Sequence, residues 1–234
     1  MKKRIWELDA LRGLCVLGMV VIHFIYDLKD TYRIISWEAP AVYQFVQDWG
    51  GVLFLLISGI SITLGKHHIK RGLVVFCAGL LVSAVTYGMY RYGFSRRIII
   101  YFGVLHCLGV CMLLWGIFRR LPTWALLASG LMLVGGGFWL DALPPVDFPW
   151  LMPLGLVYHG FTSADYFPLL PHFGFFLVGA FLGRTLYRDK TTLLPKVRDS
   201  ALPIRFLSFC GRQSLWIYLL HQPILTGICW LLML

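Results

Sequence analysis

The stretch LDALRGLCVLGMVVIHFIYDL, residues 8 to 28, decides what kind of protein this is. It is long and apolar enough to cross a bilayer as a helix, which takes about 20 predominantly apolar residues. Yet it carries four ionisable side chains: Asp9, Arg12, His23 and Asp27. Ionisable groups are costly in lipid, so a membrane helix that keeps four of them needs a reason.

The composition extends this interpretation to the whole chain. Hydrophobic residues make up 59% of the 234 residues and charged residues 14%, with a mean hydropathy of +0.74, whereas soluble domains are about 45 to 50% apolar. We therefore predict an all-α, polytopic transmembrane helical bundle of about seven spans, forming a single membrane-embedded domain over residues 1–234. The apolar runs cover residues 8–28, 50–65, 72–90, 98–118, 122–140, 170–187 and 212–233.

The basic residues report topology. A net charge of +10 would suggest a nucleic-acid partner in a soluble protein, but here the Lys and Arg side chains fall in short segments between apolar runs, so we expect none. With the N-terminus in the cytoplasm, fourteen of them lie in inner segments and five in outer ones, and the remaining two, Arg12 and Arg212, lie inside spans. The positive-inside rule thus predicts a multi-pass protein of the cytoplasmic (inner) membrane with its C-terminus outside. The Pro-rich and aromatic segment 141–171 carries no Lys or Arg and is expected to cap a cavity on the outer side.

The six cysteines predict no metal centre. Cys15, Cys77, Cys107, Cys111, Cys210 and Cys229 all lie in apolar segments and form no CxxC pair. We expect buried, unpaired thiols and no metal ion.

The ionisable side chains of residues 8–28 share one stripe of the predicted helix. His23 lies eleven positions after Arg12, which gives a net turn of about 20° and a rise of roughly 16 Å. Asp9 lies one turn before Arg12, and Asp27 one turn after His23. Either the two ends extend towards opposite headgroup layers, or Arg12 holds phosphates near the cytoplasm while His23, oriented by Asp27, acts as a base nearer the outside.

Four sequence blocks carry a family resemblance. The spacing Arg-x10-His in a first span beginning LDALRG is similar to the signature of the integral-membrane acyltransferase-3 superfamily. In order along residues 7 to 225 come ELDALRGLCVLGMVVIHFIYDL, YFGVLHCLGV, SADYFPLLPHFGFFLVGAFLGR and GRQSLWIYLLHQPIL. Together they resemble a bacterial member of the heparan-alpha-glucosaminide N-acetyltransferase catalytic-domain family.

The resemblance implies a donor, an acceptor and two site residues. Acetyl-CoA would enter from the cytoplasm and transfer its acetyl group within the membrane to an outward-facing glycan or amino sugar. His23 matches the position near which transfer occurs, with Asp27 beside it, and Arg12 matches the arginine associated with coenzyme A. A hydroxyl and an amine acceptor both stay open, as do a ping-pong and a ternary-complex mechanism and the presence of a homo-oligomer.

Further residues are candidates for the same site. Arg212 and Ser214, at the start of the last helix, could hold coenzyme A phosphates, although Arg212 could equally be a positive-inside anchor. Asp9, His106, Asp165 and His221 are candidates for lining the substrate cavity. His106 and His221 lie near mid-span, where an imidazole needs a partner or water, so packing histidines bonded to a neighbouring helix are the alternative.

Two other classes of function remain open from the residues. A membrane cytochrome would use pairs among His23, His106, His172 and His221 as axial haem ligands. A small-solute permease would line its path with the ionisable stripe, although the sequence shows no inverted repeat of the kind that many transporters have.

Overall fold

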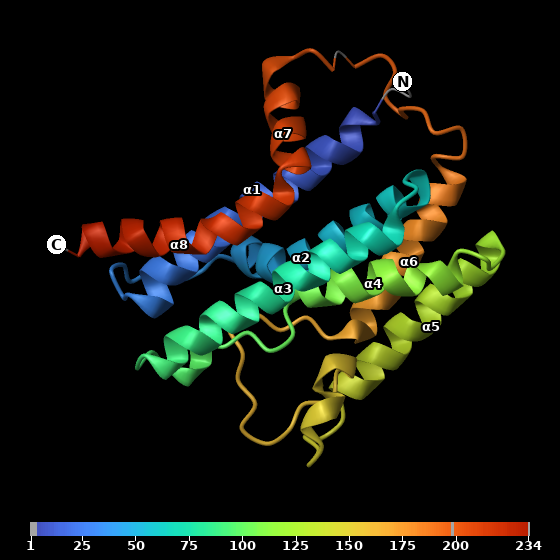
Figure 1. Ribbon diagram of the computed structural model, residues 1–234. Helices are drawn as coiled ribbons and strands as arrows, with labels where there is room; N and C mark the ends of the chain where they lie inside the picture. Colours follow the sequence, from blue (N-terminus) through green and yellow to red (C-terminus); the bar gives the residue numbers. More distant parts are fainter. Residues whose placement is uncertain (1–3, 198, 234) are drawn as a thin grey trace. The chain divides into compact units, whose positions relative to one another are not determined.

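The computed structural model describes residues 4–197 and 199–233, and within these ranges the secondary structure is helical (Figure 1). Contacts divide the chain into two compact units. Unit 1 combines the residues up to Ile57 with those from Asp189 onward, and unit 2 is Ser58–Arg188. That the chain forms one domain stays a prediction.

Each of the seven predicted apolar runs corresponds to a helix. Among the residues that the structure describes, five helices are long and apolar enough to cross a membrane, and α4 and α6 are shorter apolar helices of 15 and 17 residues. This confirms a multi-pass helical membrane protein. The helices are α1 Trp6–Tyr26, α2 Ala41–Leu64, α3 His68–Arg91, α4 Val104–Phe118, α5 Thr123–Asp141, α6 Leu169–Thr185 and α8 Ser214–Leu232.

One further helix, α7, was not predicted. It runs from Leu202 to Arg212 in unit 1 and packs against α1 (Figure 1). Its 11 residues are too few to cross a bilayer, and Arg205 interrupts its apolar residues. A search for long hydrophobic runs therefore passes over it.

Glycine allows α1 and α7 to approach at backbone distance. A Cβ atom at Gly13 would collide with the carbonyl oxygen of Leu207, and one at Gly211 with the carbonyl oxygen of Asp9. Small residues at a helix crossing permit the close van der Waals packing on which membrane helices depend. This crossing brings the end of α7 against the first turns of α1.

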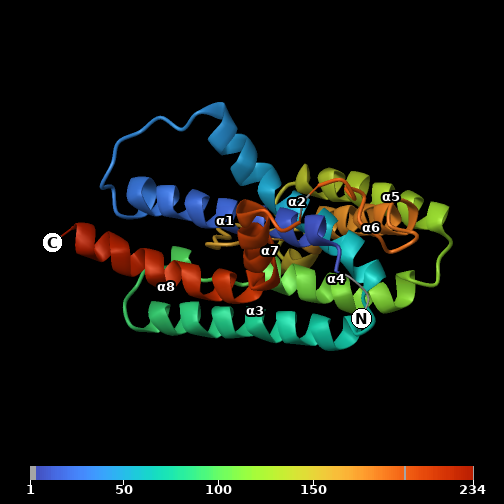
Figure 2. The same ribbon diagram turned by 90° about the horizontal axis from the view of Figure 1, so that it is seen from above.

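The end of α1 is wider than a regular α-helix. Asp27–Thr31 form a π-helical turn, η1, in which the backbone N–H of Tyr32 bonds to the carbonyl of Asp27 at 2.8 Å. Such turns occur frequently at functional sites. Residues 32–40 then run as an extended connection to α2 (Figure 2).

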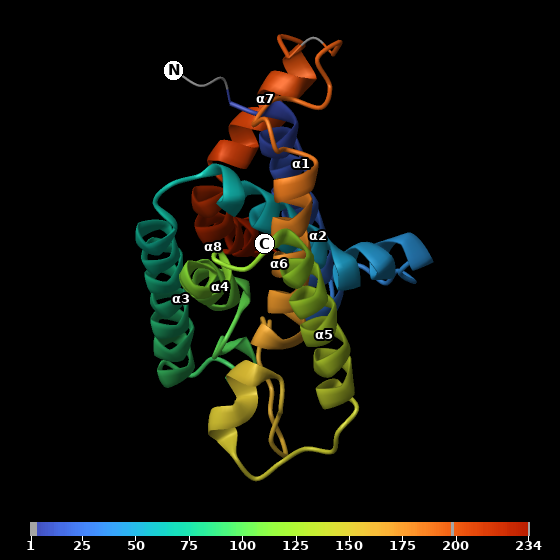
Figure 3. The same cartoon turned by 90° about the vertical axis from the view of Figure 1, so that its right-hand side faces the viewer.

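In unit 2, the non-helical segment that precedes α4 is hydrogen-bonded to the one that precedes α6. α4 packs against α3 and α6, and α6 also packs against α5. The N–H groups of Ala164 and Phe167 bond to the carbonyls of Ile99 and Phe102 at 3.1 and 2.9 Å. These bonds satisfy backbone groups that no helix could satisfy. Figure 3 shows the long connection before α6, which contains the 3₁₀-helix η3, Pro149–Leu154.

The surface of the helices is unusually apolar. Large side chains such as Val42 of α2, Met132 and Trp139 of α5, and Leu231 of α8 are exposed. Apolar surface on this scale is rare on a soluble monomer and is expected where helices face lipid.

Candidate active site

His23 and His221 meet between the first and last helices of unit 1. The Nδ1 atom of His23 lies 2.7 Å from the Nε2 atom of His221, and the ring centroids are 4.9 Å apart. The Nδ1 atom of His221 in turn bonds to the backbone carbonyl of Tyr218, one turn earlier in α8. The sequence indicated both histidines as site residues but not that they form a pair.

Asp27 contacts α8 at Gln222, the residue after His221. Its carboxyl group is buried and accepts hydrogen bonds from the amide of Gln222 at 2.8 Å and from the hydroxyl of Thr31 at 3.3 Å. The sequence suggested that Asp27 orients the His23 ring. In the structure, Nδ1 of His23 bonds to His221, and the orienting role of Asp27 stays a prediction.

At the other end of α1, Asp9 joins two arginines. Arg12 donates to Asp9 at 3.1 Å, and Arg4 lies 3.9 Å from the same carboxylate. The Arg12 side chain is only 17% exposed. Guanidinium groups form charge-assisted hydrogen bonds with carboxylates and, by the same chemistry, with phosphates.

Arg212 and Ser214 follow Gly211, which contacts the Asp9 end of α1. Gly211 packs against Asp9, Arg212 ends α7 with an exposed side chain, and Ser214 begins α8. The predicted donor residues therefore belong to the same region of unit 1.

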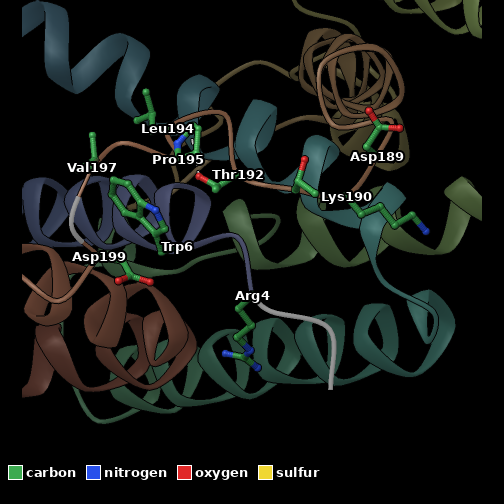
Figure 4. Close-up of a pocket in the computed structure, with 10 residues that line it drawn as sticks. Arg4, Trp6, Asp189, Lys190, Thr192, Leu194, Pro195, Val197 and Asp199 are labelled. Carbon is green, nitrogen blue, oxygen red and sulfur yellow. Dashed lines mark hydrogen bonds between the residues drawn. The ribbon is translucent and has the colours of Figure 1, made fainter.

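A cavity of about 430 Å³ adjoins Arg4 (Figure 4). Its wall is a loop that follows Asp189, and Trp6 lies beside this loop. The polar lining mixes cations with carboxylates and hydroxyls: Arg4, Lys190, Asp189, Asp199, Thr191 and Thr192.

Buried Glu7 fixes the loop that walls the cavity. Its carboxylate accepts hydrogen bonds from the hydroxyl of Thr192 and the backbone N–H of Leu193, both at 2.8 Å. A buried carboxylate needs such partners. Glu7 was not predicted as a site residue, because its only signal in the sequence is an acidic side chain at the start of an apolar run.

In unit 2, His106 and Asp165 stabilise the start of α4. Nδ1 of His106 accepts from the N–H of Gly103 at 3.2 Å, and its Nε2 lies 3.3 Å from the hydroxyl oxygen of Ser83. Asp165 accepts from the N–H of Val104 at 3.1 Å, a side-chain cap on an otherwise unsatisfied helix donor. These contacts describe structural roles, and a role in the substrate cavity stays a prediction for both residues.

Tyr166 lies in the connection between α5 and α6, next to Asp165. Its hydroxyl donates to the carbonyl of Met152 at 2.7 Å. Burial, with a smaller contribution from the Asp141 carboxylate, raises the pKa of Tyr166 to about 12. The phenol therefore stays a neutral hydrogen-bond donor at physiological pH.

The histidine geometry also bears on the haem hypothesis. Two axial ligands hold an iron atom between their ring nitrogens, and the direct 2.7 Å contact between His23 and His221 leaves no space for it. His172 directs its Nδ1 at the carbonyl of Pro168, 2.7 Å away. Haem ligation by the His23 and His221 pair is therefore disfavoured, whereas the Nδ1 contact of His172 leaves its Nε2 atom available as a ligand, and ligation by other pairs stays a hypothesis.

Fold and site define a helical, multi-pass membrane protein with a histidine pair between its first and last helices and an Arg–Asp pair about three to four turns away along α1. The chain belongs to the heparan-alpha-glucosaminide N-acetyltransferase catalytic-domain family: the family model described as "Heparan-alpha-glucosaminide N-acetyltransferase, catalytic" matches residues 4–223. No curated protein and no solved structure matches the chain. The match confirms the resemblance carried by the four sequence blocks, and membership implies a membrane acetyltransferase.

Proposed function

We propose that this protein transfers an acetyl group from cytoplasmic acetyl-CoA to a hydroxyl or amine of an outward-facing acceptor, a glycan or amino sugar. The observation that carries the proposal is the distribution of chemistry along α1: Arg12 at one end, and His23, paired with His221, roughly 16 Å away at the other. Such a helix can contact a donor from one side of the membrane and an acceptor from the other. The acceptor class rests on family membership.

The donor's phosphates would bind at the Arg12 end. Arg12 and Arg4 share Asp9, and Arg4 also lines the 430 Å³ cavity. Charge-assisted hydrogen bonds from guanidinium groups suit phosphate oxygens. The indole of Trp6 offers a stacking surface for the adenine base, so the nucleotide end would occupy the cavity and the pantetheine arm would run along α1.

His23 would act as the general base at the other end. Its ring takes the proton from the acceptor hydroxyl or amine as that oxygen or nitrogen attacks the thioester carbon. The carbon–sulfur bond then breaks, and the coenzyme A thiolate takes a proton back from the imidazolium. The products are the acetylated acceptor and free coenzyme A, and His23 returns to its neutral form.

The test separates donor binding from transfer. Calorimetric titration with coenzyme A and transfer of labelled acetyl groups to candidate amino sugars are measured on purified Arg12→Ala, Arg212→Ala and His23→Ala variants. We expect the arginine variants to lose about 1.5 to 3 kcal/mol of coenzyme A binding. His23→Ala should bind normally but transfer about 10² to 10⁴ times more slowly.

Matched controls are available in unit 2, where Arg120 and His159 are exposed. Arg120→Ala and His159→Ala should leave both binding and transfer unchanged. Wild-type transfer by His23→Ala would reduce His23 to an interfacial histidine, and unchanged affinity in both arginine variants would remove the donor site.

A further inference from the structure

We propose that His221 is a positioning residue, which holds His23 in the one neutral tautomer whose Nε2 atom is free to accept a proton. The inference rests on the proposed function, because it specifies how the base of that reaction is prepared. It follows from the hydrogen-bond chain His23, His221, Tyr218.

The direction of donation along this hydrogen-bond chain is fixed by the carbonyl of Tyr218. The backbone carbonyl of Tyr218 can only accept a hydrogen bond, so the Nδ1 atom of His221 that bonds to it must carry a proton. A neutral imidazole has one N–H group and one acceptor nitrogen. Nε2 of His221 is therefore an acceptor.

The acceptor nitrogen of His221 fixes the tautomer of His23. Its Nδ1 atom lies 2.7 Å from Nε2 of His221, and because that nitrogen accepts, Nδ1 of His23 must donate. The remaining nitrogen, Nε2, has a lone pair, and no hydrogen bond to it is formed by the residues that the structure describes. His23 is thus presented with Nε2 as its basic atom.

His221 takes the place that a carboxylate has in Ser-His-Asp enzymes, where the acid bonds to Nδ1–H of the catalytic histidine and fixes its tautomer. A neutral ring does this without placing a second full charge beside the site, which matters inside a membrane. When Nε2 of His23 gains a proton, the proton on its Nδ1 can move to Nε2 of His221. The positive charge is then shared between two rings.

Two substitutions at His221 separate positioning from packing. In His221→Gln, the side-chain oxygen lies about as far from the backbone as Nε2 and can still accept from His23. His221→Leu fills a similar volume but offers no acceptor. We expect His221→Gln to transfer within about tenfold of the wild-type rate and His221→Leu to lose about 10²-fold, both with unchanged coenzyme A affinity.

Nitrogen NMR of the histidine side chains tests the tautomer without any turnover. In ¹⁵N-histidine-labelled protein, the His23 signals are assigned by their loss in His23→Asn. We expect protonated Nδ1 and unprotonated Nε2 in the wild type and in His221→Gln, and a mixture of tautomers in His221→Leu. His159→Leu, at an exposed site, should remove only the signals of His159 and leave both the rate and the His23 signals unchanged.

The outcomes distinguish this inference from the proposed function. Wild-type activity in His221→Leu, or a wild-type spectrum with the proton on Nε2 of His23, overturns the positioning role. A wild type that transfers no acetyl group overturns the proposed function, while the spectrum still decides the tautomer. If His221→Leu does not fold, His221→Gln and the wild-type spectrum carry the test.

Discussion

Each ionisable side chain in the stripe of α1 has a polar partner within unit 1. Asp9 bonds to Arg12, His23 to His221, and Asp27 to Gln222. Pairing of this kind offsets the cost of removing charged and polar groups from water. A membrane helix can therefore keep four such residues, and two of the three contacts orient groups towards α8.

At Asp27, the geometry predicts graded effects. Asp27→Asn preserves size and can still accept one hydrogen bond and, with a rotated Gln222 amide, donate another. Asp27→Leu removes the acceptor of both the Gln222 amide and the Thr31 hydroxyl, and each lost hydrogen bond costs about 0.5 to 1.5 kcal/mol. Acetyl-transfer rates and thermal unfolding of both variants should show a mild loss for Asn and a large one for Leu. Equal effects would mean that the hydrogen bonds of Asp27 do not matter.

On the scale of an element, the crossing of α1 and α7 predicts an asymmetric response to added methyl groups. Gly13→Ala places a Cβ atom against the carbonyl of Leu207, and overpacking of this kind costs about 1 to 3 kcal/mol. Gly18→Ala, in the same helix, has nothing within 4 Å of the new atom and should not destabilise. Thermal unfolding in detergent compares the two, and similar melting temperatures would contradict the close crossing.

A second prediction for an element concerns the loop attached to Glu7. Glu7→Ala removes the acceptor for both Thr192 and Leu193, so the loop should open more often. Limited trypsin digestion should then cut faster after Lys190 and Lys196, whereas Glu7→Gln, which keeps an acceptor oxygen, should change less. Cleavage after Lys70, in unit 2, provides the internal reference, and equal acceleration there would indicate general unfolding instead.

The elements also show what sequence patterns can and cannot predict. Hydropathy located the seven apolar helices because span length and composition are local properties. It missed α7, which is short and interrupted by Arg205. The stripe of α1 indicated Arg12 and His23 from helical periodicity, but the partner of His23 lies 198 residues away, and no local pattern contains such a contact. Glu7 was missed because its role depends on a loop near the other end of the sequence.

For the whole molecule, the question to test is whether the short helices α4 and α6 cross the membrane as the five longer ones are able to do. If all seven apolar helices cross, the C-terminus lies opposite the N-terminus; if only the five long ones cross, the same holds. The termini therefore cannot distinguish the two paths, but the connections beside α4 and α6 can. With seven crossings and an inner N-terminus, Lys66 and Arg119 face the cytoplasm and Asp147 the outside. With five crossings, Arg119 and Asp147 exchange sides.

We predict the seven-span arrangement, because the positive-inside rule assigns the basic residues Arg119 and Arg120 to the cytoplasm and the segment around Asp147, which has no Lys or Arg, to the outside. Single cysteines replace Lys66, Arg119 or Asp147 in a chain whose six native cysteines, all free thiols, are changed to alanine. In intact cells, an impermeant thiol reagent should label only the cysteine at position 147, and detergent lysis should expose all three. Labelling at 119 alone would indicate that α4 and α6 do not cross. Labelling at 66 and 119 but not at 147 would mean that the protein has the opposite orientation, with the Arg12 end of α1 and its proposed donor site outside the cell.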